Sequence, residues 1–201
     1  MTSKGYAVIK EFIKNSKIKI EFVVSERDSK IKKDFYSEIE SVCLLNSIDF
    51  FNKKNIPLIP EECLIIAVSW KWIINVRGSK LIVFHDSLLP RLRGFNPLVT
   101  SLINGDKSIG VSAIFGSEEY DRGDIIFQHS TQISYPITIL EAINFVEKSY
   151  AKISKDLVKV LSKNQFPKAS PQNEKFATYS LWREESDYFI DWKLSSYQIR
   201  R

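Results

Sequence analysis

His85 is one of only two histidines in the chain, and it directly follows an apolar run, residues 81–84, of the kind that forms a buried strand. The polar residues Asp86 and Ser87 come next, and the chain then turns at Pro90. Ligands of open α/β sheets usually bind at the carboxyl ends of strands. A histidine at such a place is therefore a candidate for accepting or donating a proton.

Asp121 is a second candidate for proton chemistry. It stands two residues before Gly123, and the pattern Asp-x-Gly is also common in turns, so a structural role is the alternative. If the strand ends that carry His85 and Asp121 face one crevice, the two side chains can relay a proton and hold a water between them. Asp124, which follows the glycine, is interpreted as support for the loop.

Three tracts of this chain resemble the folate-dependent formyltransferases: HDSLLP at 85–90, Arg93-Gly94 and Asp121-Arg122-Gly123. The signature of that family is Asn-x-His-x-Ser-Leu-Leu-Pro-x-x-Arg-Gly followed by Asp-x-Gly, and its members include glycinamide ribonucleotide, methionyl-tRNA and sugar-nucleotide formyltransferases. The resemblance extends over residues 25–161, with weaker matches at 190–192 and 198–200. It implies that His85 and Asp121 are the catalytic residues of a one-carbon transferase.

Val83 departs from the family pattern, because it occupies the position of the asparagine that offers an amide to the formyl oxygen. Formyl transfer to an amine passes through a tetrahedral intermediate and needs donors for the developing oxyanion, and loss of one such donor costs on the order of 10² to 10³ in rate. Either another donor substitutes, or the protein is a weakened or non-catalytic relative that binds folate or a nucleotide sugar.

The formyl donor that the resemblance implies is N10-formyltetrahydrofolate, which leaves as tetrahydrofolate. A flat aromatic cofactor favours an apolar slot with few directed hydrogen bonds. Core packing is the alternative role for Trp72. The residues expected to form the slot are Ser69, Trp70, Lys71, Trp72, Val83, Ser87, Leu88, Leu89, Pro90, Tyr120 and Gly123.

The expected acceptor is the amino group of a nucleotide-linked amino sugar used for cell-surface polysaccharide such as lipopolysaccharide. Arginine grips phosphate bidentately, although arginines beside a turn are often merely solvated, and Arg93 could equally hold the loop together. The residues expected to bind this substrate are Arg91, Arg93, Gly94, Phe95, Asn96 and Pro97. The tract 95–97 and the tryptophans at 70 and 72 resemble the sugar branch of the family.

A methionyl-tRNA formyltransferase-type enzyme is the alternative, but those enzymes carry a further C-terminal β-domain for which 201 residues leave no room. The net charge of +5 and the pI of about 9.1 favour an anionic partner. The lysines are scattered rather than gathered, and basic and aromatic residues do not interleave, which argues against nucleic acid. A homodimer is an open expectation.

Composition places the chain among ordinary globular proteins, with 44% hydrophobic and 26% charged residues. Its longest apolar runs, 64–68 and 81–84, are far shorter than the roughly 20 residues of a membrane span, and no signal-like segment opens the sequence. These features predict a cytoplasmic protein. Cys43 and Cys63 have no CxxC partner or nearby histidine, which predicts reduced thiols and no metal site.

The periodicity of apolar residues predicts strands that alternate with helices, and hence a mostly parallel, Rossmann-like α/β sheet flanked by helices with a short C-terminal appendage. Residues Phe35, Ile39, Val42, Cys43 and Leu45 are expected on the buried side of their helix. The family usually has another strand before its first helix, so the sheet is expected to lack an edge. The predicted helices cover 4–14, 34–46, a stretch from 97 and about 137–161; the predicted strands cover 17–25, 64–68, 81–84, 109–115 and 125–132.

Composition changes after Lys163, where Asn, Gln, Ser and Pro become frequent. This shift predicts a catalytic domain at 1–163, and a linker with an aromatic-rich appendage at 164–201. The aromatic residues between 176 and 192 are expected to form a hairpin packed back on the domain.

Overall fold

The computed structural model of the protein describes residues 2–29, 31, 33–72, 74 and 80–199. The chain forms two compact units, each assembled from two separate stretches. Unit 1 comprises residues 1–84 and 150–168, and unit 2 comprises residues 85–149 and 169–201. The division at 163 that composition suggests stays a prediction.

Unit 1 begins with two helices, α1 (Ser3–Phe12) and α2 (Tyr36–Leu45), both close to their predicted positions. On α2 the fully buried residues Ile39 and Cys43 lie four positions apart and share one face. The prediction that Leu45 is buried was wrong, since this side chain is 82% exposed. It stands two residues after Cys43, which is about 200° around the helix.

Strands β1 (Phe22–Ser25) and β2 (Asp49–Asn52) pair in parallel, with Phe22 opposite Asp49. The strand predicted at 17–25 forms only in its last four residues, and the sequence pattern did not reveal β2. Its two apolar residues are adjacent and lie between two polar ones, so β2 lacks the alternation that indicates a strand. Phe50 on β2 contacts Tyr36 of α2 edge to face, with ring centroids 5.1 Å apart.

Strands β3 (Leu64–Val68) and β4 (Lys80–His85) form the second parallel pair, in the register Leu64 with Lys80. Both match the predicted apolar runs. Branched aliphatic residues fill these strands because helices can cover a parallel sheet on both faces. The sequence also predicts a turn around Gly78, and that stretch lies outside the described residues.

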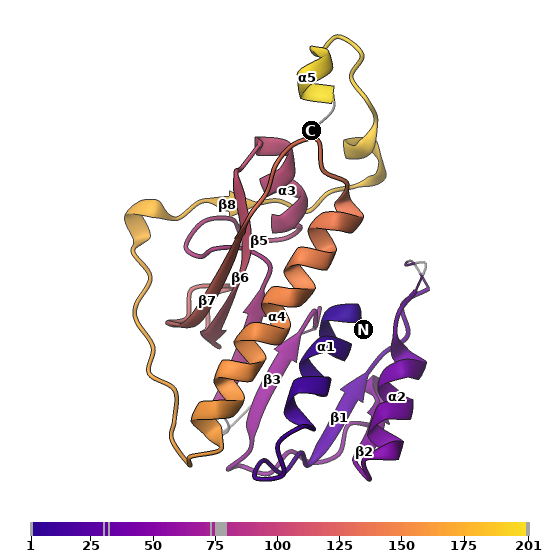
Figure 1. Ribbon diagram of the computed structural model, residues 1–201, viewed down its shortest axis with the longest axis vertical. Helices are drawn as coiled ribbons and strands as arrows, with labels where there is room; N and C mark the ends of the chain where they lie inside the picture. Colours follow the sequence, from indigo (N-terminus) through magenta and orange to yellow (C-terminus); the bar gives the residue numbers. More distant parts are fainter. Residues whose placement is uncertain (1, 30, 32, 73, 75–79, 200–201) are drawn as a thin grey trace. The chain divides into compact units, whose positions relative to one another are not determined.

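Helix α4 (Ile139–Leu161) confirms the predicted long helix, and its residues belong to unit 2 up to Ser149 and to unit 1 from Tyr150 onward (Figure 1). Within unit 1 the ring of Tyr150 stacks on Phe84 at 5.2 Å between centroids, and Leu157 is fully buried. No helix among the described residues is long and apolar enough to cross a membrane.

Unit 2 contains β5 (Arg93–Gly94), α3 (Pro97–Asn104), β6 (Ser108–Phe115) and β7 (Ile125–Gln132). The pair β6–β7 is antiparallel, with Ser108 opposite Gln132, whereas β1–β2 and β3–β4 are parallel, so the expected mostly parallel arrangement is confirmed with this pair as an exception. Parallel neighbours need a crossover of a dozen or more residues, and the connection 116–124 is shorter and contains no helix. The fold is therefore α/β with mixed strand directions.

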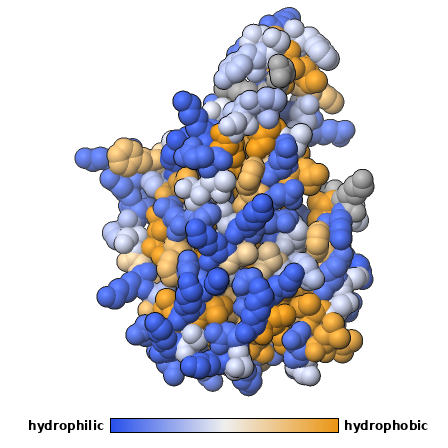
Figure 2. All heavy atoms as spheres, in the orientation of Figure 1, coloured by the Kyte–Doolittle hydropathy of each residue, from blue (hydrophilic) through white to orange (hydrophobic). Residues whose placement is uncertain are grey.

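The last part of unit 2 contains η2 (Glu174–Phe176), β8 (Tyr179–Ser180), η3 (Glu185–Tyr188) and α5 (Ser196–Ile199). Strand β8 pairs in parallel with β5, with Arg93 opposite Tyr179, so the described residues do not form the predicted aromatic hairpin. Two short strands distant in sequence pair instead. Several aromatic residues beyond β8 are exposed, and Figure 2 shows hydrophobic surface in the segment around α5.

Replacing Leu157 by Ala should lower the free energy of unfolding by about 2–5 kcal/mol, because it leaves a cavity where a fully buried side chain stood. Leu58→Ala is the matched control. It removes the same atoms from a side chain that is 94% exposed, so it leaves no cavity. Urea denaturation followed by circular dichroism measures both changes. Equal effects of the two substitutions would contradict the burial of α4.

Candidate active site

His85 is the last residue of β4 and is 8% exposed. Its Nε2 lies 2.8 Å from the main-chain oxygen of Leu92. Because a carbonyl only accepts, Nε2 carries the hydrogen, and the neutral ring presents the lone pair of Nδ1 on its other side. Nδ1 lies 3.4 Å from Oδ1 of Asp121, so the histidine and the aspartate predicted from sequence lie together within unit 2.

Asp121 lies in the connection between β6 and β7 with a main-chain φ of +58°, a left-handed conformation that few residues other than glycine adopt. Its Oδ2 accepts a hydrogen bond of 2.8 Å from the main-chain N–H of Gly94. One carboxylate oxygen is thus held by the backbone of β5. The other oxygen is left facing the imidazole of His85.

Gly94 is required by a close approach of two chain segments. It has a φ of +94°, and a Cβ at this position would stand 2.5 Å from the main-chain oxygen of Ser180. That oxygen accepts a hydrogen bond from the N–H of Phe95 at 3.0 Å, within the β5–β8 ladder. A side chain at position 94 would therefore push apart the strands that present the N–H to Asp121.

Arg93 is 1% exposed and lies against the Asp121 loop. Its Nε and Nη2 donate to Oε1 of Gln172 at 3.1 and 2.8 Å, and Nη1 and Nη2 donate to the two carboxylate oxygens of Glu174 at 2.9 and 2.7 Å. The hydrogen bond from Arg93 lowers the pKa of Glu174, and the same pair raises the pKa of Arg93. The buried charge is thus compensated by a bidentate partner.

The loop after His85 is fixed to β6 and β7 by Ser112 and Gln128. The hydroxyl of Ser112 accepts from the N–H of Leu89 at 3.0 Å and donates to the oxygen of Ser87 at 2.6 Å. The amide of Gln128 donates to the oxygen of Leu89 at 2.8 Å. These contacts hold the backbone turn that brings the Leu92 carbonyl to His85.

Comparison with known proteins identifies the family of this chain. The family model described as formyl transferase matches residues 64–165, which is just over half of the chain and includes both His85 and Asp121. The chain belongs to the formyl transferase family. Membership follows from that match alone. The short distance between His85 and Asp121 is an independent observation.

Curated relatives of this formyl transferase family member are methionyl-tRNA formyltransferases. That of Fusobacterium nucleatum is 31% identical over 189 residues, covering 88% of this chain and 61% of the relative. That of Carboxydothermus hydrogenoformans is 31% identical over 150 residues, covering 71% and 47%. The chain thus spans less than two thirds of the length of these relatives.

Similar solved structures include WlaRD, a sugar 3N-formyl transferase crystallised in the presence of dTDP and 5-N-formyl-THF, with a TM-score of 0.74 at 19% identity over 98% of this chain and 73% of that one. The N-formyltransferase of Helicobacter canadensis, in complex with folinic acid and dTDP-3-aminofucose, has a TM-score of 0.74 at 17% identity over 99% and 75%. At such identity the likeness establishes the fold, an α/β formyltransferase fold with helices flanking a mixed sheet.

The residues predicted for the folate slot of this family member fall in both units. In unit 1, Ser69 has a φ of +49°, and its Oγ lies 3.1 Å from Oγ1 of Thr2. Trp70 and Trp72 meet edge to face with centroids 4.8 Å apart, and Nε1 of Trp70 is buried with no hydrogen-bond partner among the described residues. Lys71 instead forms an ion pair of 2.7 Å with Asp28.

Val83 and the remaining slot residues have distinct local roles. Val83 lies opposite Ala67 in the β3–β4 register. In unit 2, Leu88 packs so closely on Gly110 that a Cβ there would stand 2.5 Å from its side chain, and Leu89 is 3% exposed. The hydroxyl of Ser87 donates to the main-chain oxygen of Arg91, and Pro90 follows a cis peptide bond. Tyr120 is 75% exposed. A Cβ on Gly123 would collide with the main-chain oxygen of Phe115.

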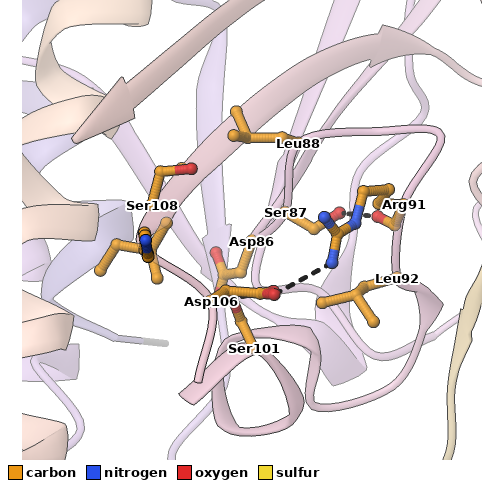
Figure 3. A pocket seen from close by; sticks show the side chains of 11 residues that line it. Asp86, Ser87, Leu88, Arg91, Leu92, Ser101, Asp106 and Ser108 are labelled. Carbon is orange, nitrogen blue, oxygen red and sulfur yellow. Dashed lines mark hydrogen bonds and ion pairs between the residues drawn. The ribbon is translucent and has the colours of Figure 1, made fainter. Parts of the chain in front are cut away.

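The two arginines predicted to grip phosphate already have acidic partners. Arg93 is committed to Gln172 and Glu174, and Arg91 forms an ion pair of 3.0 Å with Asp106. Figure 3 shows the Arg91–Asp106 pair at a cavity of about 270 Å³ that neither His85 nor Asp121 lines. The phosphate-binding role of either arginine stays a prediction, and both guanidinium groups now have a structural use.

The rest of the predicted acceptor tract forms the turn into α3. Phe95 is 54% exposed and meets Trp182 edge to face, with centroids 5.4 Å apart. Asn96 is the N-cap residue in a left-handed conformation, and Pro97 opens the helix, where its missing N–H costs no hydrogen bond. Trp182 was not among the predicted site residues, since nothing in its local sequence pairs it with Phe95.

The described residues contain no group of three or more side chains that could hold a metal ion. Both cysteines are free, and burial raises the pKa of Cys43 to about 11. A buried thiol of this kind stays protonated at neutral pH and is a poor nucleophile.

Glu174→Gln should destabilise the protein at neutral pH and have little effect in acid. The folded-state pKa of Glu174 is lowered below the ordinary 4.5, so its stabilising pair with Arg93 is present above that value and is lost as pH falls through the lowered pKa. Urea denaturation across this range measures the difference between wild type and variant. Glu185→Gln, at an exposed glutamate of the same segment, is the control, and a pH-independent difference would contradict this assignment.

Proposed function

We propose that this protein transfers a formyl group from N10-formyltetrahydrofolate to the amino group of a nucleotide-linked amino sugar. The observation that carries the chemical part of the proposal is the His85–Asp121 pair, with Nδ1 and Oδ1 3.4 Å apart and every other polar atom of the pair held by the backbone. An amine that attacks a formyl group must lose a proton, and this pair is placed to take it.

The hydrogen bond from Nε2 to Leu92 fixes the imidazole, so the lone pair of Nδ1 is the site that accepts the proton. The resulting imidazolium lies between the Leu92 carbonyl and the Asp121 carboxylate, which both stabilise positive charge. Asp121 is itself prevented from rotating by the N–H of Gly94. When bound, the folate supplies an activated one-carbon acyl group on nitrogen.

The residues of this chain fit such a donor in one specific respect. A reduced pterin is flat and rich in hydrogen-bond acceptors, and Trp70 offers an aromatic surface together with a buried Nε1–H for which the described part of the chain supplies no partner. Trp72 is 41% exposed, and the ammonium of Lys53 lies 3.7 Å from its ring centroid. We propose that this aromatic pair forms part of the wall that holds the folate.

Support for a nucleotide-linked acceptor comes from Phe95 and Trp182. Both rings are more than half exposed, and Phe95 directly follows Gly94, the residue that binds the Asp121 carboxylate. Consecutive Cα atoms lie about 3.8 Å apart, so the backbone of Phe95 adjoins the residue that holds Asp121. Exposed aromatic rings stack flat bases, and the two sugar N-formyltransferases compared above were crystallised with dTDP or a dTDP-sugar.

Methionyl-tRNA is the second candidate acceptor. It is favoured by the curated relatives, which are named for that reaction and are 31% identical to this chain over the aligned 189 and 150 residues. Both candidates place an amine at the same catalytic pair. They differ in the partner that must be recognised beyond the amine.

The deciding experiment supplies the purified protein with N10-formyltetrahydrofolate and, in parallel, with a panel of dTDP-linked amino sugars or with methionyl-tRNA. Mass spectrometry should find the gain of one carbonyl group on an amino sugar, and His85→Ala should abolish it. Formylation of methionyl-tRNA alone would transfer the assignment to the second candidate. Absence of product with every acceptor, despite folate binding measured by calorimetry, would favour a non-catalytic relative.

If the protein catalyses formyl transfer without the asparagine amide of the family pattern, Val83→Asn should increase turnover at least about tenfold. Val83 stands two residues before His85 on β4, so the two side chains leave the same face of the strand, and an amide there would restore a donor for the developing oxyanion. Steady-state kinetics at saturating folate measures the gain, with Val83→Leu as the control, because leucine has a similar shape to asparagine and no hydrogen-bond donor. An unchanged rate would mean that the oxyanion is held elsewhere.

A further inference from the structure

We propose that Gln172 is a positioning residue that holds Asp121 in its working conformation. This inference rests on the proposed formyl transfer, in which Asp121 stabilises the proton on His85. Gln172 touches neither of the two side chains that do the chemistry. It acts on the main chain that carries Asp121.

The amide group of Gln172 has all of its hydrogen-bonding positions in use. Nε2 donates to the main-chain oxygens of Asp121 at 2.7 Å and Gly123 at 2.8 Å. Oε1 accepts from Nε and Nη2 of Arg93. Two donors and two lone pairs are the full inventory of a primary amide, so its orientation is uniquely determined.

The two carbonyls that Gln172 binds belong to Asp121 itself and to Gly123, two residues further along the loop. With a φ of +58°, Asp121 is in a conformation that residues with a Cβ rarely adopt unless their surroundings impose it. Gly123 packs against Phe115, where a Cβ would stand 1.6 Å from the main-chain oxygen. The loop therefore packs on β6 at Gly123 and is hydrogen-bonded to Gln172 at two carbonyls.

Arg93 connects this clamp with the carboxylate of Asp121. Arg93 binds the amide oxygen of Gln172, and the next residue, Gly94, donates its N–H to Oδ2 of Asp121. One short strand therefore fixes the side chain of Asp121 directly and its main chain through Gln172. If the loop relaxes, Oδ1 leaves Nδ1 of His85, and displacements of about 1 Å at a reacting centre can cost roughly 10² in rate.

Gln172→Glu is the most selective variant. A carboxylate keeps the size of the amide and the bonds from Arg93 but has no donor for the two carbonyls. We expect kcat to fall about tenfold or more with little change in KM for either substrate. In an Asp121→Asn background the same substitution should cause no further loss, because a residue that acts only through Asp121 has nothing left to position.

A readout without turnover separates this proposal from the proposed function. The chain has two histidines, so the imidazole nitrogen NMR signals of His85 can be assigned, with His129 as an internal reference. Gln172→Glu should move the His85 signals toward those of Asp121→Asn and leave His129 unchanged. Gln165→Glu, at an exposed glutamine seven positions earlier in the chain, should change neither.

Unchanged His85 signals in a folded Gln172→Glu protein would overturn the positioning role, as would a further loss of activity in the double variant. If Gln172→Glu does not fold, Gln172→Met offers an uncharged side chain of similar length for the same comparison. A wild-type protein that formylates no acceptor would refute the proposed function alone. The NMR comparison would still decide whether Gln172 positions Asp121.

Discussion

The two-residue ladder between β5 and β8 determines the geometry of the site. It fixes Gly94 against Ser180, and Gly94 presents its N–H to the carboxylate of Asp121. The same strand begins with Arg93, whose buried charge would be costly if it were not fully compensated by Gln172 and Glu174. The N–H of Gly94 binds only Oδ2 of Asp121, so Oδ1 of the same carboxylate faces His85.

His85 and Asp121 are held in place by hydrogen bonds to the backbone. His85 is held at Nε2 by a carbonyl and Asp121 at Oδ2 by an N–H, so each partner has one committed atom and one that faces the other. Preorganised groups of this kind need no rearrangement when charge develops. Val83 is the exception, since it contributes no polar atom where the family pattern has an amide.

The sequence predicted the features that are local and missed those that depend on distant partners. His85 and the loop after it were recognisable because the strand, the break and the turn follow one another within a few residues. The long apolar period of α4 and the runs of β3 and β4 were recognisable for the same reason. Gln172 and β8 gave no such signal, because their partners lie between 49 and 86 residues away.

The β5–β8 ladder also has a consequence for how the protein matures on the ribosome. Synthesis delivers residues 172–180 well after His85, Gly94 and Asp121, and domains fold as their parts emerge. Until that late segment docks, the Asp121 loop lacks the amide that binds its two carbonyls, and Arg93 lacks its acidic partner. Long-range contacts form slowly compared with helices. The nascent chain therefore forms its helices before residues 172–180 fix the position of Asp121.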